Sequence, residues 1–179
     1  MNDLSEPVRN NDNQDHQAKL EKCINFLNEI GIKTIWKTLG PGTFLPGLSI
    51  EKGCIIIDRD ALSYPGDILH EAGHVAVVPA AERSILNADS IKMRRTREAE
   101  EMMAIAWSYA ACIHLGLDPC FVFHDEGYQG GGSHIAENFN NKRYFGLPML
   151  QWIGLAADEK KASILNVSPY PCMIKWLRD

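Results

Sequence analysis

The sequence predicts an α+β fold in which a small, mostly antiparallel sheet packs on two helices and is followed by an irregular C-terminal extension. Residues 32–58 alternate short β-type segments with glycine and proline turns, a pattern typical of short strands. Residues 67–78 and 97–115 carry the apolar spacing of buried helices. Beyond residue 118, prolines and glycines interrupt the apolar runs, which predicts the irregular extension.

Length and composition are those of one globular domain. The chain has 179 residues, of which 45% are hydrophobic and 23% charged, enough to bury a core without disulfides. Residues 1–15 are rich in Asn, Asp and Gln, and we expect them to form a disordered tail. We expect residues 16–179 to form a single domain, in which residues 118–179 are an appended region of unassigned role.

Composition also argues against several classes of protein. The net charge of -5 does not favour nucleic acid as a partner. The five cysteines are odd in number and contain no C-x-x-C pair, which predicts reduced thiols in a cytoplasmic protein rather than disulfides or a cysteine zinc site. The N-terminus lacks the apolar segment of a signal peptide, and no run of about 18 apolar residues is present to span a membrane.

The first elements follow from periodicity and turn residues. A helix is predicted over residues 16–30, where apolar residues recur at helical spacing before a glycine. Residues 32–39 and 54–58 have the composition of strands. Residues 43–50 are expected to form an irregular or edge strand, because Pro46 cannot donate a hydrogen bond to a neighbouring strand.

Two longer helices are predicted next. Pro79 ends the first, which has Asp67 in its first turn. Thr96 is a candidate N-cap for the second, from Arg97 to about Leu115. An extended stretch, a short helix and a proline-interrupted apolar segment are expected after it, at residues 120–123, 133–141 and 147–154.

The pentapeptide His-Glu-Ala-Gly-His at residues 70–74 has the pattern H-E-x-x-H. On a helix, His70 and His74 lie one turn apart on the same face. Two imidazoles at this spacing can hold Zn2+ at about 2.0–2.1 Å, and Glu71 lies close enough to accept a proton from a metal-activated water. A chance match on a surface helix is the alternative, but apolar residues flank the motif as they flank a buried helix, so we predict a metal site.

A catalytic zinc site needs a third protein ligand and keeps a fourth position open. The extended pattern H-E-x-x-H-x-x-G-x-x-H fails, because Val77 and Ala80 stand where Gly and His are required. The next helix offers Glu98, Glu100 and Glu101 near its start. Glu101 has apolar neighbours, and a buried carboxylate needs a partner, so we predict Glu101 as the third ligand, with Glu98 as the second choice.

At these residues the chain resembles the ImmA/IrrE-type minimal gluzincins. The residues that carry the resemblance are His70, Glu71, His74 and Glu101-Met102-Met103-Ala104. It covers about residues 32–115 and implies a zinc-dependent peptidase acting on a peptide or protein, with His70, His74 and Glu101 as ligands and Glu71 as general base. Ile105 departs from the family, in which an asparagine often follows that alanine. The pentapeptide also resembles the FtsH-type motif, but no ATPase domain accompanies it.

A second group of candidates surrounds the glycine run at residues 130–132. His124 and Tyr128 are candidates to contact substrate or to stabilise an oxyanion, and His134 and Tyr144 are weaker ones. His124 is also an alternative third ligand. The contrasting interpretation is a flexible surface loop whose histidine is solvated.

Three functions remain open from the sequence. The first is a zinc-dependent hydrolase, a peptidase of gluzincin type. The second is a non-catalytic regulatory or protein-interaction module that keeps the metal-binding scaffold, suggested by residues 118–179 and by the basic cluster in residues 92–97, which otherwise is a solvated face. The third is a structural metal site closed by His124 or Asp125.

Overall fold

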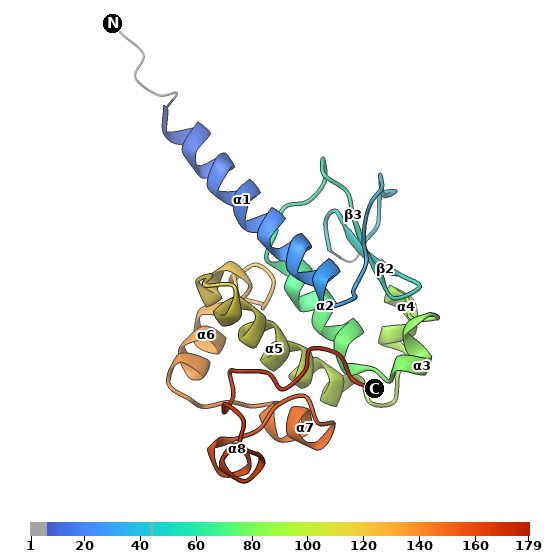
Figure 1. Ribbon diagram of the computed structural model, residues 1–179. Helices are drawn as coiled ribbons and strands as arrows, with labels where there is room; N and C mark the ends of the chain where they lie inside the picture. The colour runs from blue at the N-terminus through green and yellow to red at the C-terminus, as the bar shows by residue number, and fades with distance from the viewer. Residues whose placement is uncertain (1–6, 44) are drawn as a thin grey trace, which may run out of the picture.

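The computed structural model describes residues 7–43 and 45–179. In this part of the chain the elements confirm an α+β fold, with the sheet, α3 and α4 on one side of a central helix pair and α6 to α8 on the other (Figure 1). The helices are α1 (Pro7–Glu29), α2 (Asp67–Val77), α3 (Ala80–Arg83), α4 (Ala88–Lys92), α5 (Arg97–His114), the 3-10 helix η1 (Pro119–Phe121), α6 (Gly132–Asn140), α7 (Leu147–Trp152) and α8 (Glu159–Leu165). The strands are β1 (Thr34–Trp36), β2 (Leu48–Glu51) and β3 (Cys54–Ile57).

The sheet is mixed, with strand order β1-β3-β2. Strand β2 pairs antiparallel with β3 through a tight turn in which Lys52 and Gly53 have φ of 51° and 71°, the left-handed conformation that such two-residue hairpins require. Strand β1 pairs parallel with β3. The expectation of a mostly antiparallel sheet missed this second pair, because β1 reaches β3 through a long connection whose course the local sequence does not specify.

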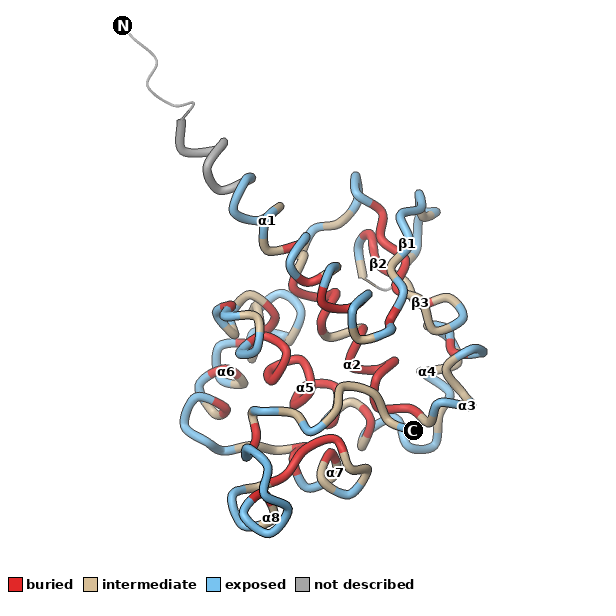
Figure 2. Tube along the Cα trace, in the orientation of Figure 1, coloured by how far each residue is buried: buried red, intermediate tan, exposed pale blue. Residues whose placement is uncertain are grey.

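Helices α2 and α5 form the buried centre of the molecule (Figure 2). They are in tight contact at Gly73, where an added Cβ would lie 2.9 Å from the Ala104 carbonyl oxygen and 3.1 Å from the Ala104 Cβ. Only glycine therefore lets the two backbones come this close. On the other side of α2, the fully buried Ile55 and Ile57 of β3 belong to the same hydrophobic core.

Helix α1 begins at Pro7, inside the stretch for which a disordered tail is expected, and residues 1–6 of that stretch lie outside the described residues. The C-terminal half of α1 is anchored by Leu20, Cys23 and Leu27, which are buried in the core. Once this half is fixed, extending the helix adds one hydrogen bond per residue without a new nucleation cost. Proline is also tolerated in a first helical turn.

The C-terminal region packs back onto α5. The Tyr170 hydroxyl donates to the Ala106 carbonyl at 2.8 Å, and the Trp107 indole N–H donates to the Trp176 carbonyl at 2.9 Å. One hydrophobic cluster includes residues from Leu20 in α1 to Tyr170. The region is more regular than expected, because it holds three short helices, and the first two residues of the predicted extended stretch at 120–123 belong to the 3-10 helix η1. None of the helices in the described residues has the length and apolarity needed to cross a membrane.

We expect Gly73→Ala to lower the free energy of unfolding by about 1–2 kcal/mol. The added methyl group overpacks the contact with Ala104 at a cost of about 1–3 kcal/mol, which exceeds the gain of up to about 1 kcal/mol from replacing a helical glycine by alanine. Urea denaturation measures the difference. Gly40→Ala is the matched control, since a Cβ there meets no atom within 4 Å. A Gly73→Ala protein as stable as the wild type would contradict the tight contact.

Candidate metal centre

His70, His74 and Glu101 form a compact cluster between α2 and α5. The Nε2 atoms of His70 and His74 each lie 3.3 Å from a different carboxylate oxygen of Glu101. The two imidazole rings stand nearly perpendicular, at 88°, with their centroids 4.9 Å apart. One ligand atom from each of the three residues lies within 4.8 Å of the other two.

This donor set fits a zinc ion. Two ligands at about 2.0–2.2 Å from a tetrahedral zinc lie about 3.3–3.6 Å apart, which agrees with the two histidine–carboxylate distances of 3.3 Å. The side chains of His70 and His74 are 12% and 8% exposed, whereas that of Glu101 is 42% exposed. The site is therefore enclosed on the histidine side and open on the glutamate side, as a site with a free coordination position must be.

The electrostatics of the cluster favour an ionised Glu101 carboxylate. Burial raises the pKa of Glu101, but His70 and His74 lower it far more, so the carboxyl pKa falls well below its usual range. Burial lowers the pKa of His70, but Glu101, with Glu71 and Asp67, raises it above the usual value. An ionised carboxylate thus lies against two imidazoles, and these three side chains are the ones that would hold a cation.

The N-terminal turn of α5 is held by a network that directs Glu101 toward α2. The buried carboxylate of Glu100 accepts hydrogen bonds from Arg94 at 2.6 and 2.9 Å and from the Thr96 hydroxyl at 2.8 Å. Burial raises the pKa of Glu100, but these donors lower it below its usual value. Thr96 occupies the predicted N-cap position but uses its hydroxyl for Glu100, and Arg94 also donates to Glu82 at 2.7 Å.

The prediction that the basic side chains of residues 92–97 form a solvated face is therefore wrong for Arg94. Arg94 is only 20% exposed and bridges two carboxylates. Arg95 and Arg97 are exposed. Charge runs in sequence do not reveal which arginine a distant carboxylate will engage, and Glu82 lies twelve residues away from Arg94.

Tyr128 supports His70 from the side opposite Glu101. Its hydroxyl oxygen lies 3.2 Å from the Nδ1 atom of His70, and the two rings meet edge to face at 86°. With a metal held at Nε2, Nδ1 would carry the proton and donate it to the Tyr128 oxygen, which would fix the ring orientation. Burial raises the pKa of Tyr128 far above its usual value, so the phenol stays neutral.

His124 does not join the metal cluster but ties its loop to α2. Its Nε2 donates to the Asp67 carboxylate at 2.8 Å, and its Nδ1 accepts from the Gly127 N–H at 3.1 Å. The Tyr64 ring stacks on it, 4.0 Å away and 11° from parallel. The segment at residues 124–131 is thus attached to the first turn of the helix that carries both histidines.

The remaining candidates lie apart from the cluster. Glu98 is exposed, and the side chain of His134 is 80% exposed with Glu137 as its nearest acid. Tyr144 packs with other aromatic rings, among them Tyr170. Asp125 is exposed, and its carboxylate accepts a hydrogen bond from the Ser133 backbone N–H. In the described residues this loop therefore supplies no fourth ligand that would close the metal site.

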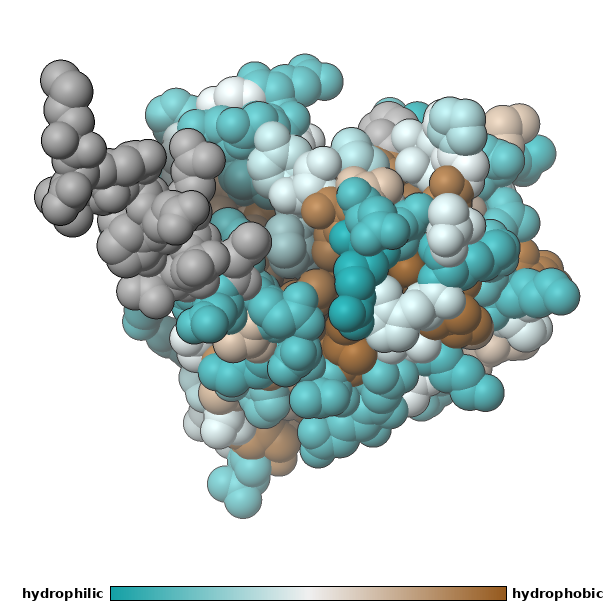
Figure 3. Space-filling model, turned by 90° about the horizontal axis from the view of Figure 1, so that it is seen from above, coloured by the Kyte–Doolittle hydropathy of each residue, from teal (hydrophilic) through white to brown (hydrophobic). Residues whose placement is uncertain are grey.

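A cavity of about 470 Å3 opens beside the cluster. Glu71, His74 and Glu101 line it together with Leu45 and Leu48 from β2 and the loop before it. Its volume lies in the range of small-molecule and peptide sites. On the molecular face in Figure 3, hydrophobic residues gather in the middle and hydrophilic residues surround them. Glu71, the predicted base, therefore faces the same space as two of the three predicted ligands.

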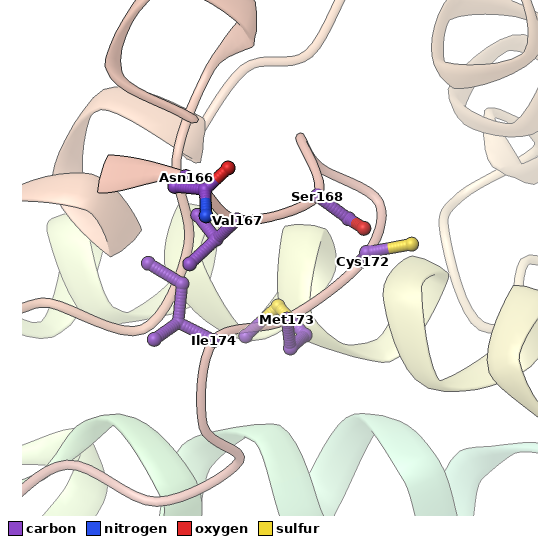
Figure 4. Close-up of a pocket in the computed structure, with 6 residues that line it drawn as sticks. All are labelled: Asn166, Val167, Ser168, Cys172, Met173 and Ile174. Carbon is purple, nitrogen blue, oxygen red and sulfur yellow. The ribbon is translucent and has the colours of Figure 1, made fainter. Parts of the chain in front are cut away.

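Two other cavities lie in the C-terminal region. One of about 590 Å3 is lined by Asn166, Val167, Ser168, Cys172, Met173 and Ile174 (Figure 4). A neighbouring one of about 790 Å3 is lined by residues of α7, α8 and the segment around Tyr170. In the described residues, the group of side chains placed to hold a metal ion is His70, His74 and Glu101, and two of these line the cavity beside Glu71.

Comparison with protein-family models, curated proteins and solved structures gives no match to the chain. The resemblance to the ImmA/IrrE-type gluzincins stays a prediction.

Three features of the site were missed by the sequence reasoning. They are the Gly73–Ala104 contact, the Arg94–Glu100 pair and the Asp67–His124 pair. Gly73 did carry a signal, since an isolated glycine inside a helical pattern usually has a packing reason. The two ion pairs carried none, because the sequence does not distinguish their buried acids from the many solvated ones.

We expect the purified protein to bind about one zinc per chain, and His70→Ala and Glu101→Ala each to lose it, since two remaining ligands cannot fill a stable site. Elemental analysis of protein supplied with zinc measures the content. Glu98→Ala is the matched control, because this acid is exposed and lies outside the cluster. Zinc retained in Glu101→Ala but lost in Glu98→Ala would reverse the assignment of the third ligand.

We expect Tyr128→Phe to weaken zinc affinity by about 10–100-fold while leaving thermal stability nearly unchanged. The phenylalanine keeps the ring packing but removes the acceptor for His70 Nδ1, and partners of this kind have effects of that size. Competition with a chromophoric chelator gives the affinity. Tyr144→Phe, in the aromatic cluster away from the site, should bind zinc as the wild type does. Equal affinity in both variants would remove Tyr128 from the positioning of His70.

Proposed function

We propose that this protein is a zinc-dependent hydrolase of the gluzincin type that cleaves peptide bonds. His70, His74 and Glu101 would hold the metal and Glu71 would act as general base. The observation that carries the proposal is the pair of 3.3 Å distances from Glu101 to the two histidines beside a cavity that Glu71 also lines. The resemblance to the ImmA/IrrE-type minimal gluzincins supports the same reaction class.

Zinc at such a site makes water acidic enough to deprotonate near pH 7 and polarises carbonyl oxygens. The Glu71 carboxylate would accept the proton of the attacking water and return it to the leaving amine as the peptide bond breaks. Tyr128 keeps His70 in one orientation through Nδ1. The Arg94–Glu100 pair keeps the first turn of α5 in place, so that Glu101 stays between the imidazoles.

The cavity supports a peptide as substrate. Leu45, Leu48 and Ile91 give it an apolar wall that suits a side chain next to the cleaved bond. In the described residues β2 pairs with β3 along one edge. On its other edge Leu48 forms a bridge to Leu45, and the rest of that edge keeps backbone groups that can bind an extended chain. The five cysteines are free, which supports a reducing compartment such as the cytoplasm.

A second candidate function is a non-catalytic metal-binding module that recognises another protein. The observation that favours it is the exposed apolar surface of the C-terminal region, where Trp152 is 89% and Ile164 is 75% exposed. The lining position of Glu71 beside the cluster favours the hydrolase, because a purely structural metal site needs no acid facing the cavity.

We expect Glu71→Gln to keep about one zinc per chain but to lower the hydrolysis rate by at least about 100-fold, because the amide cannot accept the proton. Mass spectrometry of a proteome-derived peptide library, incubated with zinc-loaded protein, identifies the cleaved bonds and their rates. Removing zinc with a chelator should abolish cleavage and adding it back should restore the activity.

Glu98→Gln is the matched control, since it removes an exposed acid from the same helix as Glu101 and should leave cleavage unchanged. Cleavage by Glu71→Gln at the wild-type rate would refute the proposed mechanism. Zinc binding without metal-dependent cleavage of any library peptide would favour the non-catalytic module.

A further inference from the structure

The cavity beside the cluster has a basic side that the proposed hydrolysis does not use. Arg97 and Lys92 line it together with Glu71 and Glu101. Arg97 and Glu101 are both on α5 and are four residues apart, so they lie on the same face of the helix, one turn from each other. A molecule in the cavity that reaches the cluster at Glu101 can therefore also reach the guanidinium of Arg97.

Arg97 differs from the nearby Arg94 in its partners. Arg94 is occupied by Glu82 and Glu100. Among the side chains that the structure describes, those of residues 14–43 and 45–179, no carboxylate lies within 4.0 Å of the Arg97 guanidinium. Lys92 has Asp89 at 4.0 Å, and the side chain of Asp89 is 96% exposed. The cavity thus holds a guanidinium whose hydrogen-bond donors are available to a ligand.

The position of Arg97 in its helix is unfavourable without such a ligand. It is the first residue of α5, where the helix dipole favours acids such as Glu98 and Glu100 and disfavours a cation. An arginine there contributes no ion pair to the fold in the described residues. Binding an anion in the cavity would offset this local cost.

The charges of the lining indicate what kind of anion fits. Two bases, Lys92 and Arg97, face three acids, Glu71, Asp89 and Glu101, so the lining has a net charge of -1. A divalent zinc in the proposed site would make it +1. One positive charge balances a carboxylate better than a doubly charged phosphate. Guanidinium also matches the planar carboxylate with two parallel hydrogen bonds.

We infer that Arg97 binds a carboxylate of the substrate, with Lys92 beside it, and so makes the cleft selective for acidic peptides. This inference rests on the proposed function for its substrate class, a peptide whose cleaved bond lies at the histidine–glutamate cluster. The carboxylate is that of an aspartate or glutamate side chain or that of a peptide C-terminus. Both present the same group to the guanidinium.

Peptide binding tests the inference without requiring hydrolysis. The probes are synthetic decapeptides of alanine and leucine in which one glutamate is moved through each position, each paired with its glutamine counterpart and made with a free or an amidated C-terminus. Fluorescence anisotropy measures their binding to zinc-loaded Glu71→Gln protein. The same measurement is made with Arg97→Gln and Arg95→Gln added separately to that background.

We expect glutamate peptides to bind about tenfold more tightly than their glutamine counterparts at one or two adjacent positions, the effect of one charge-assisted pair. Arg97→Gln should remove this difference, and Arg95→Gln should keep it, because Arg95 is exposed but does not line the cavity. If amidation of the C-terminus, rather than replacement of glutamate, removes the Arg97-dependent affinity, the bound group is the terminal carboxylate.

A glutamate or C-terminal preference that survives Arg97→Gln, or no preference for either carboxylate, would overturn the inference. Failure of the proposed function has a different signature. If the wild-type protein with zinc leaves the bound peptides intact while Arg97-dependent binding persists, the hydrolase is wrong and the carboxylate site stands. If it cleaves library peptides without any dependence on Arg97, the hydrolase stands and the carboxylate site is wrong.

Discussion

The close contact between α2 and α5 at Gly73 and Ala104 is the constraint on which the rest of the site depends. Gly73 lies between His70 and His74 in sequence, and Ala104 follows Glu101 by three residues, close to one helical turn. When the two backbones touch at this point, the carboxylate of one helix is brought against the imidazoles of the other. A larger residue at either position would separate the helices and draw the carboxylate away from the histidines.

Other parts of the chain hold this contact from several directions. Strand β3 supports α2 with Ile55 and Ile57, and Arg94 with Glu100 fixes the start of α5. At the C-terminal end of α2, the Arg178 backbone N–H donates to the Ala76 carbonyl at 3.0 Å. Residues more than one hundred positions apart thus stabilise one helix pair, and the proposed catalytic geometry is a property of the whole fold rather than of the pentapeptide motif.

The sequence predicted those features that local patterns encode. Apolar spacing predicted α1 over residues 16–30, α2 and α5, and the H-E-x-x-H pattern with an apolar neighbourhood predicted the cluster that includes Glu101. Features made by contacts distant in sequence were not predicted, such as the parallel pairing of β1 with β3. Tyr128 was a candidate for its residue type, but its contact with His70, fifty-eight residues earlier, depends on the path of a loop.

The attachment of residues 124–131 to α2 has a thermodynamic consequence. His124 is hydrogen-bonded to Asp67, and Tyr128 contacts His70. The equilibrium between the attached and detached states of residues 124–131 is therefore linked to the orientation of His70, a proposed metal ligand. A cation that binds the cluster favours the attached segment, and anything that pulls the segment away must weaken the cation's affinity by the same factor. A partner that binds residues 124–131 would therefore change the metal occupancy of the His70–His74–Glu101 cluster without entering the cavity.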